Sequence, residues 1–228
     1  MSVTSPSIEE SLAKAEHALD SGSGLSGTGF WAAVSTVKRN PELADRFAER
    51  IAVIDERAHR QWAVLVIPLW LGTLLAWVAV LIGLALVWWA YDLSGTGAVV
   101  AFFAGTGVLL GSTHGLGHLV VGRLLGMRFT YWFVGEVRQP QPGVKLDYAT
   151  YLRTPPKRRA WMHASGALTT KAIPFLLIGA AIAADLPGWV PWVLAGLGTV
   201  MVVTDALWST QASDWKKFRR EMEFAQGS

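Results

Sequence analysis

The sequence predicts an all-α integral membrane protein with four transmembrane helices. It also predicts an N-terminal cytoplasmic helical region and a cytoplasmic loop between the second and third helices. The composition is the first reason, because 52% of the 228 residues are hydrophobic and only 16% are charged, which is typical of membrane proteins. The second reason is four apolar stretches of the ~20 residues or more that a transmembrane helix needs. The third is the one-sided distribution of lysine and arginine between these stretches.

The four predicted spans cover about residues 62–91, 93–122, 160–184 and 186–212. The first two contain no charged residue, the third contains Lys171 and the fourth contains Asp205. The short connections within each pair of spans have no lysine or arginine, whereas the segments before, between and after the pairs are basic. The positive-inside rule therefore predicts that both termini are cytoplasmic, and the expected location is the inner (plasma) membrane of a prokaryote.

Residues 1–60 are predicted to form the cytoplasmic helical region, with a Gly/Ser linker at 21–29. No signal peptide is visible, because the first apolar run is too long and follows ~60 mainly polar residues. Ser7-Ile-Glu-Glu10 matches a capping box, and Asn40-Pro41 marks the start of a second helix. That helix has an apolar stripe, which we expect on the membrane surface or against a core: Leu43, Phe47, Ile51 and Ile54.

Residues 61–220 are predicted to form the transmembrane domain, and 221–228 a cytoplasmic tail. The loop at 129–159 begins with the β-like 129-FTYWFV-134 and continues with turns rich in Pro and Gly. It is expected to form either a short β-hairpin or an extended strand that contacts a substrate. The basic residues lie beside apolar segments, so they indicate topology and contact with membrane lipids rather than nucleic acid.

Ionisable residues inside a bilayer are costly and mark functional sites. Here they are His114, His118, Lys171 and Asp205, with His163 near the edge of the third span. At ~1.5 Å per residue, His118 lies roughly 8 Å and His114 roughly 14 Å from the cytoplasmic boundary, and Asp205 roughly 16 Å. Because the chain has no cysteine, a metal would need histidine and carboxylate ligands, a set that suits zinc. His114, His118 and Asp205 are therefore predicted zinc ligands.

Other interpretations of these residues stay open. The two histidines would also serve as hydrogen-bonding groups between helices, and Lys171 and Asp205 would satisfy one another as a buried ion pair. Haem ligation by His114 and His163 is a further alternative. The glycines that recur every four residues predict a small-residue face for close helix packing: Gly107, Gly111 and Gly115.

Over roughly residues 93–220 the chain resembles the site-2 protease family of intramembrane zinc metalloproteases. The segment 114-HGLGHLVVGRLLGMRF-129 is similar to that family's His-Glu-x-x-His helix, and 155-PPKRRAWMHASGALTT-170 to its proline-basic stretch that leads into the next helix. The resemblance places Asp205 where a later helix supplies the third zinc ligand. It implies a zinc-binding three-helix core, preceded here by one extra helix.

Three positions depart from the family pattern. Gly115 stands where the family has the glutamate that acts as general base, Ala167 replaces a proline, and Thr170 stands where an asparagine is usual. Zinc ligation does not need the glutamate, but peptide hydrolysis needs a base, whose contribution is roughly 10²–10⁴-fold in rate. Three carboxylates elsewhere are candidates for a relocated base: Glu136, Asp147 and Asp214.

The leading functional expectation is a non-proteolytic relative of the family that holds zinc and binds or sequesters a transmembrane helix of a partner protein. One alternative is an active intramembrane metalloprotease with a relocated base. Another is a small transporter or channel-like bundle that uses Lys171, Asp205 and the histidines as a polar path.

Overall fold

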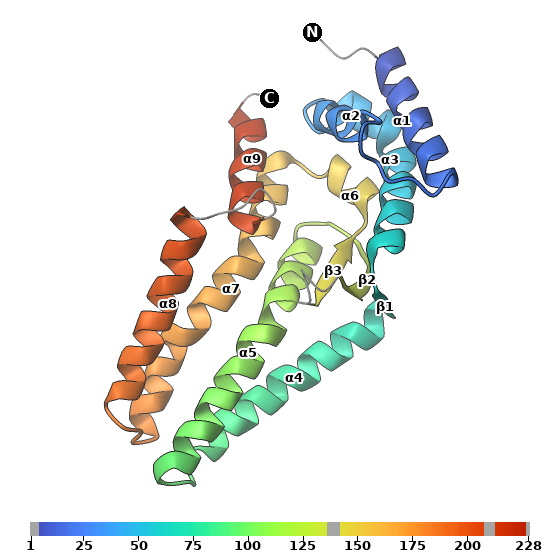
Figure 1. Cartoon of the computed structure of the whole chain (residues 1–228). Helices are drawn as coiled ribbons and strands as arrows, with labels where there is room; N and C mark the ends of the chain where they lie inside the picture. The colour runs from blue at the N-terminus through green and yellow to red at the C-terminus, as the bar shows by residue number, and fades with distance from the viewer. Residues whose placement is uncertain (1–4, 136–141, 208–212, 227–228) are drawn as a thin grey trace. The chain divides into compact units, whose positions relative to one another are not determined.

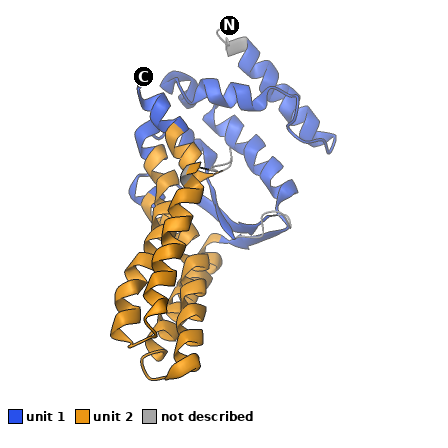
Figure 2. Ribbon diagram, turned by 60° about the vertical axis from the view of Figure 1, so that its left-hand side comes forward, with its two compact units in different colours: residues 1–68, 122–159, 220–228 blue, residues 69–121, 160–219 orange. Residues whose placement is uncertain are grey.

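The computed structural model describes residues 5–135, 142–207 and 213–226, most of which are helical (Figure 1). Two compact units share the chain: residues 1–68, 122–159 and 220–228 form unit 1, and residues 69–121 and 160–219 form unit 2 (Figure 2). The elements follow in this order: α1 (Ser5–Asp20), α2 (Phe30–Val37), α3 (Pro41–Trp62), β1 (Leu65–Pro68), α4 (Leu69–Trp89), α5 (Gly95–Leu124), β2 (Phe129–Val134), β3 (Gly143–Leu146), α6 (Tyr148–Arg153), α7 (Pro156–Ala183), α8 (Trp189–Leu207) and α9 (Asp214–Gln226).

The helical part of unit 1 contains three helices before the first strand, one more than predicted. Helix α3 begins where Asn40-Pro41 predicted, because the Asn40 side chain accepts hydrogen bonds from the backbone N–H groups of Glu42 and Leu43. Helix α1 begins at Ser5, before the predicted capping box. Helix α2 follows the 21–29 linker and was not predicted; its Phe30, Ala33, Val34 and Val37 are buried.

The apolar stripe of α3 packs inside unit 1. Phe47, Ile51 and Ile54 are at most 4% exposed, and α3 contacts α1, α2 and α6. Helix α1 contributes a matching stripe at helical spacing, all of it buried: Ile8, Leu12, Ala15 and Leu19. Of the two expected positions for the stripe, a core is therefore the one observed.

A three-stranded antiparallel sheet in the order β1-β2-β3 completes unit 1. The predicted hairpin is confirmed, since Phe129 pairs with Leu146 and Phe133 with Gly143. Strand β1 corrects the first predicted span, because Leu65 to Pro68 pair with Val134 to Tyr131 and the helix begins only at Leu69. Leu65, Val66 and Ile67 pair their backbone N–H and C=O groups with strand β2. Hydropathy alone does not distinguish such an apolar, β-branched strand from the start of a transmembrane helix.

Unit 2 contains the four apolar helices, and its core joins side chains from α4, α5, α7 and α8. Helices α4 and α5 approach closely at two glycines: a Cβ at Gly105 would lie 2.6 Å from the carbonyl oxygen of Gly83. The predicted packing face is wrong at Gly107 and Gly111, where a Cβ would meet nothing within 4 Å. Helix α5 instead approaches α7 closely at Gly117, where an added Cβ would lie 2.8 Å from Thr169 Oγ1.

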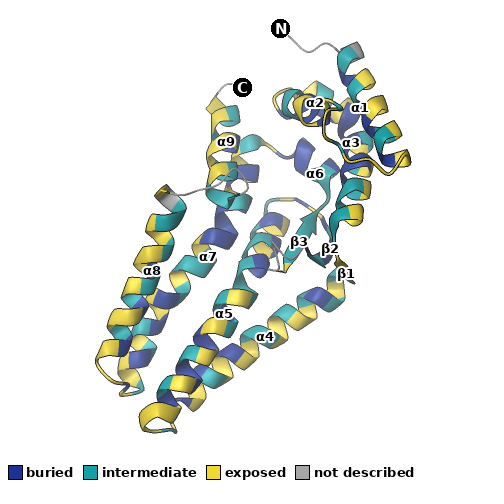
Figure 3. Ribbon diagram, in the orientation of Figure 1, coloured by how far each residue is buried: buried dark blue, intermediate teal, exposed yellow. Residues whose placement is uncertain are grey.

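Among the described residues, three helices are long and apolar enough to cross a membrane: α4, α5 and α7. The helices of unit 2 carry many exposed residues, coloured yellow in Figure 3. Large apolar side chains are among them, since Trp70, Leu81, Leu176 and Trp192 are each more than 60% exposed. These features indicate membrane association. The apolar stretch of α8, Trp189–Asp205, is shorter, so a fourth span and the cytoplasmic position of the termini stay predictions.

Candidate metal centre

His114 and His118 lie one turn apart on α5, and their ring centroids are 4.8 Å apart with perpendicular planes. Asp214, the first residue of α9, brings a carboxylate to both rings. Its Oδ2 lies 3.2 Å from His114 Nε2 and 3.1 Å from His118 Nε2. The three potential ligand atoms lie within 4.8 Å of one another. The donor atoms of a tetrahedral zinc site lie about 3.3 Å apart, given zinc–ligand distances of about 2.0–2.1 Å, so this group could hold a metal ion.

Asp205, the carboxylate that the sequence predicted as third ligand, lies elsewhere in unit 2. Its Oδ2 is 2.6 Å from Lys171 Nζ, so the ion pair that the sequence left as an alternative is the arrangement observed. Asp214 takes the place predicted for Asp205 beside the histidines. The estimated depth of Asp205 matched that of His114, but depth along a helix axis does not show which neighbouring helix a side chain faces.

The His118 ring is oriented by the backbone of α7. Its Nδ1 atom lies 2.8 Å from the carbonyl oxygen of Met162. A carbonyl oxygen only accepts hydrogen bonds, so Nδ1 must carry the hydrogen and donate it. In the neutral ring, Nε2 then has a lone pair that faces Asp214.

His114 has the same tautomer for a related reason. Its Nδ1 atom lies 3.1 Å from Thr170 Oγ1. The Thr170 hydroxyl donates its one hydrogen to the carbonyl oxygen of Gly166, at 3.0 Å, so towards His114 it can only accept. Both histidines therefore present Nε2 lone pairs to one carboxylate oxygen. Three electron-rich atoms this close repel one another unless a protonated ring donates its Nε2–H to the carboxylate or a metal cation lies among them. Second partners on Nδ1 are typical of metal-binding histidines.

Gly166 provides space for the His118 ring. A Cβ at this position would lie only 2.3 Å from His118 Nε2 and 2.6 Å from two ring carbons. Because a side chain of any size would displace the ring, the glycine permits α7 to approach α5 at the site.

The Asp214 carboxylate is partly buried, with 16% of its side chain exposed. Burial opposes its ionisation, but the adjacent imidazole groups of His114 and His118 and the charge of nearby Lys217 outweigh burial and hold the pKa of Asp214 well below its usual range. Lys217 Nζ lies 3.3 Å from the other carboxylate oxygen, Oδ1. Asp214 is therefore an anion with one oxygen directed at the histidines.

The remaining sequence candidates have other surroundings. Gly115 is buried and has no side chain to act as base. Asp147 caps α6 by accepting a hydrogen bond from the backbone of Ala149, and Glu136 lies outside the described residues. Among the described residues, the potential metal-ligating group consists of His114, His118 and Asp214. Haem ligation by His114 and His163 stays an alternative from the sequence.

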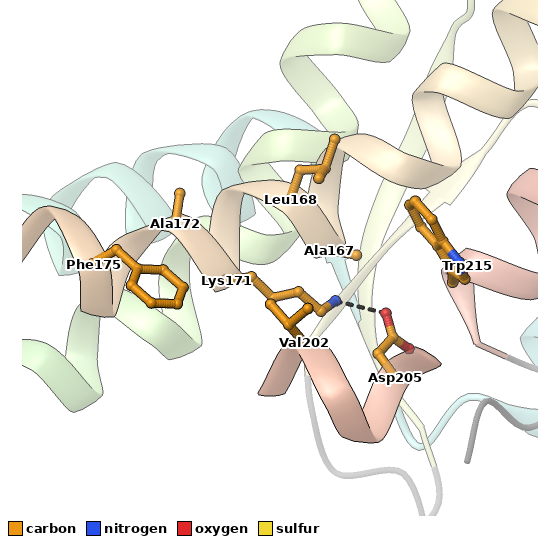
Figure 4. Close-up of a pocket in the computed structure, with 8 residues that line it drawn as sticks. All are labelled: Ala167, Leu168, Lys171, Ala172, Phe175, Val202, Asp205 and Trp215. Carbon is orange, nitrogen blue, oxygen red and sulfur yellow. Dashed lines mark hydrogen bonds and ion pairs between the residues drawn. The ribbon is translucent and has the colours of Figure 1, made fainter. Parts of the chain in front are cut away.

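A cavity of about 330 Å³ lies in unit 2 and is almost entirely apolar apart from the Lys171–Asp205 pair (Figure 4). The residues that line it are Ala167, Leu168, Lys171, Ala172, Phe175, Val202, Asp205 and Trp215. Three of these directly follow residues of the histidine site in the chain: Ala167 follows Gly166, Lys171 follows Thr170 and Trp215 follows Asp214. The cavity therefore begins next to the candidate metal centre.

No protein-family model, curated protein or solved structure matches this chain. The functional argument therefore depends on the residues and their geometry.

Proposed function

We propose that this chain is an integral membrane protein with a site-2-protease-like core that holds a zinc ion through His114, His118 and Asp214. The observation that carries this proposal is the pair of fixed tautomers, which direct two Nε2 lone pairs at one carboxylate oxygen. Two imidazoles and one carboxylate form a ligand set that suits zinc and leaves a fourth position for water or another ligand.

The same core is proposed to be non-proteolytic. A bound zinc ion would polarise a water molecule or a carbonyl oxygen, but hydrolysis of a peptide bond also needs a group that moves protons. Gly115 cannot accept a proton, and the carboxylate that contacts the histidines is the proposed ligand Asp214. Its Oδ1 atom is near the Lys217 ammonium, which makes that oxygen a poor proton acceptor.

The proposed role is to bind or sequester an apolar segment of a membrane partner. The cavity beside the histidine site supports this role, because its walls are apolar side chains from α7, α8 and α9. The Lys171–Asp205 pair, which is part of the cavity lining, offers a charged group to a polar residue of that segment (Figure 4). A transmembrane helix of a partner protein has the required chemistry, with apolar side chains along most of its length.

Metal analysis of the purified full-length protein tests the zinc proposal. Protein prepared in detergent without chelators should contain about one zinc per chain, and a His118→Ala variant should contain almost none. A His17→Ala variant, changed at an exposed position of α1, is the matched control and should keep its zinc. Absence of zinc from the unchanged protein would contradict the proposal.

An active protease is the second candidate, and the position of Asp214 favours it. A carboxylate next to both Nε2 atoms could act as a base on a metal-bound water instead of as a ligand. The two candidates differ in a cleavage assay with a model transmembrane substrate. A non-proteolytic core should gain cleavage in a Gly115→Glu variant, whereas an active protease should cleave without that change and lose cleavage in Asp214→Asn.

A further inference from the structure

A second cavity, of about 230 Å³, lies in unit 1 among α2, α6 and α9. Five of its lining residues carry hydrogen-bond donors: Trp31, Ser35, Lys38, Tyr148 and Arg220. Trp31 and Phe224 contribute aromatic walls, and no carboxylate is among the described residues that line the cavity. It is separate from the histidine site, whose residues all belong to unit 2.

The charges behind this cavity do not balance. Lys38 Nζ lies 2.9 Å from Glu221 Oε1, and Arg159 Nε lies 2.8 Å from Glu221 Oε2. All three side chains are buried, at 9%, 1% and 0% exposure for Lys38, Arg159 and Glu221. One carboxylate therefore faces two cations, and the nearby Lys145–Asp55 pair adds no net charge. Arg220 adds a further positive charge at the cavity, and it forms no ion pair within the described part of the chain.

A buried excess of positive charge is unfavourable. Burial is the main reason that the pKa of Lys38 falls to about 8, and the positive charges of Arg220 and Arg159 act in the same direction as burial. Glu221 opposes the fall without cancelling it. An anion in the cavity would supply the missing negative charge.

Several donors that line the cavity are also unused. A lysine ammonium has three hydrogens, and Lys38 donates to Glu221 and to the Tyr151 hydroxyl, which leaves one. Within the described residues, the hydroxyls of Ser35 and Tyr148 form no hydrogen bond. These donors and the Arg220 guanidinium surround a single small cavity.

We propose that the cavity lined by Ser35, Lys38, Tyr148 and Arg220 binds a phosphate group. A lysine point charge, a planar guanidinium and hydroxyl donors together suit the several oxygens of a phosphate better than the two oxygens of a carboxylate. The aromatic walls at Trp31 and Phe224 would contact the organic part of the ligand. The phosphate belongs either to a small soluble molecule or to a lipid headgroup.

Binding measurements on the full-length protein in phosphate-free detergent solution test this proposal. Inorganic phosphate is the probe for a soluble ligand, and phosphatidic acid in mixed micelles is the probe for a lipid, with phosphatidylcholine as its reference. Isothermal titration should show saturable binding of at least one probe. Binding of inorganic phosphate assigns the site to a soluble ligand, and binding of phosphatidic acid alone assigns it to a lipid headgroup.

An Arg220→Gln variant should weaken this binding about tenfold or more, the loss expected for a charge-assisted hydrogen bond. Arg220 is exposed and lies outside the buried charge cluster, so the variant should fold even if a Lys38→Gln variant does not. Lys216→Gln, which changes an exposed cation of the same helix away from the cavity, is the control and should bind normally. Equal binding by the two variants, or no binding of either probe, would overturn the proposal.

Discussion

His118 Nε2 lies 3.1 Å from Asp214 Oδ2, while Nδ1 of the same ring donates its hydrogen to the carbonyl oxygen of Met162. In the neutral ring, Nε2 therefore faces the carboxylate with a lone pair, which a cation between the two atoms would accept; only a doubly protonated ring would donate a hydrogen to Asp214. His114 is held in the same tautomer by Thr170. This relationship underlies the zinc proposal. The Met162 carbonyl and the Thr170 hydroxyl, which contact Nδ1 of the two rings, therefore matter to the proposed site as much as the ligands do.

Replacing Gly166 should disturb the metal site without removing a ligand. In a Gly166→Ala variant the new methyl group would overlap the His118 ring, so the ring must move and zinc affinity should fall at least tenfold. Competition with a chromogenic chelator measures this affinity. Gly179→Ala on the same helix is the control, because a Cβ there meets nothing within 4 Å. Equal zinc affinity of the two variants would show that the Gly166–His118 contact does not matter.

Thr170 should act through the tautomer of His114. A Thr170→Val variant keeps the shape of the side chain but removes the acceptor for Nδ1–H, and second-sphere partners of this kind contribute about 10- to 100-fold in metal affinity. A Thr170→Ser variant retains the hydroxyl and should retain most of the affinity. The same chelator competition measures both variants, and a Val variant that binds zinc as tightly as the Ser variant would argue against the assigned tautomer.

Glu221 should be essential to the stability of unit 1. Its carboxylate is fully buried between Lys38 and Arg159, so Glu221→Gln would leave two buried cations without a counter-charge. The expected loss is about 3–5 kcal/mol, seen as a lower midpoint of thermal unfolding in detergent. Glu223→Gln, at an exposed position of the same helix, should have little effect. A small, similar shift for both variants would mean that water reaches the cluster.

His59 should make unit 1 sensitive to acid. Burial, with the charges of Lys145 and Arg60, lowers the pKa of His59 to about 4, from an ordinary value of 6.5. The unfolded chain then binds more protons than the folded chain between about pH 4 and 6.5, so this residue reduces stability as the pH falls through that window. Thermal unfolding midpoints at pH 7 and pH 4.5 should differ less in His59→Gln than in the unchanged protein. A His17→Gln control, at an exposed position, should keep the full difference.

The sequence predicted most of the helical fold because its signals were local. The cap at Asn40, the spacing of Phe47, Ile51 and Ile54, and the length of the apolar stretches each depend on neighbours in the chain. Strand β1 was missed because Leu65 to Pro68 continue an apolar run, and only their pairing with β2 distinguishes them from a helix.

Only the part of the candidate site that depends on neighbours in the chain could be predicted from the sequence. The spacing of His114 and His118 is a local property of α5 and placed both rings together, as observed. The third member depends on how separate helices pack, and the estimated depth in the membrane pointed to Asp205. Asp214 lies at the start of a polar helix, and the sequence singled it out only as one of three candidates for a relocated base. The roles of Gly166 and Thr170 likewise depend on contacts between α5 and α7.

The most direct test of the zinc proposal is a comparison of metal content in two aspartate variants. Asp214→Ala removes the carboxylate beside the histidines, and Asp205→Ala removes the carboxylate beside Lys171. Both proteins should be purified in detergent without chelators, and zinc measured by elemental analysis. The proposal predicts that Asp214→Ala loses most of its zinc while Asp205→Ala keeps about one ion per chain. Retention of zinc by Asp214→Ala together with its loss from Asp205→Ala would contradict it.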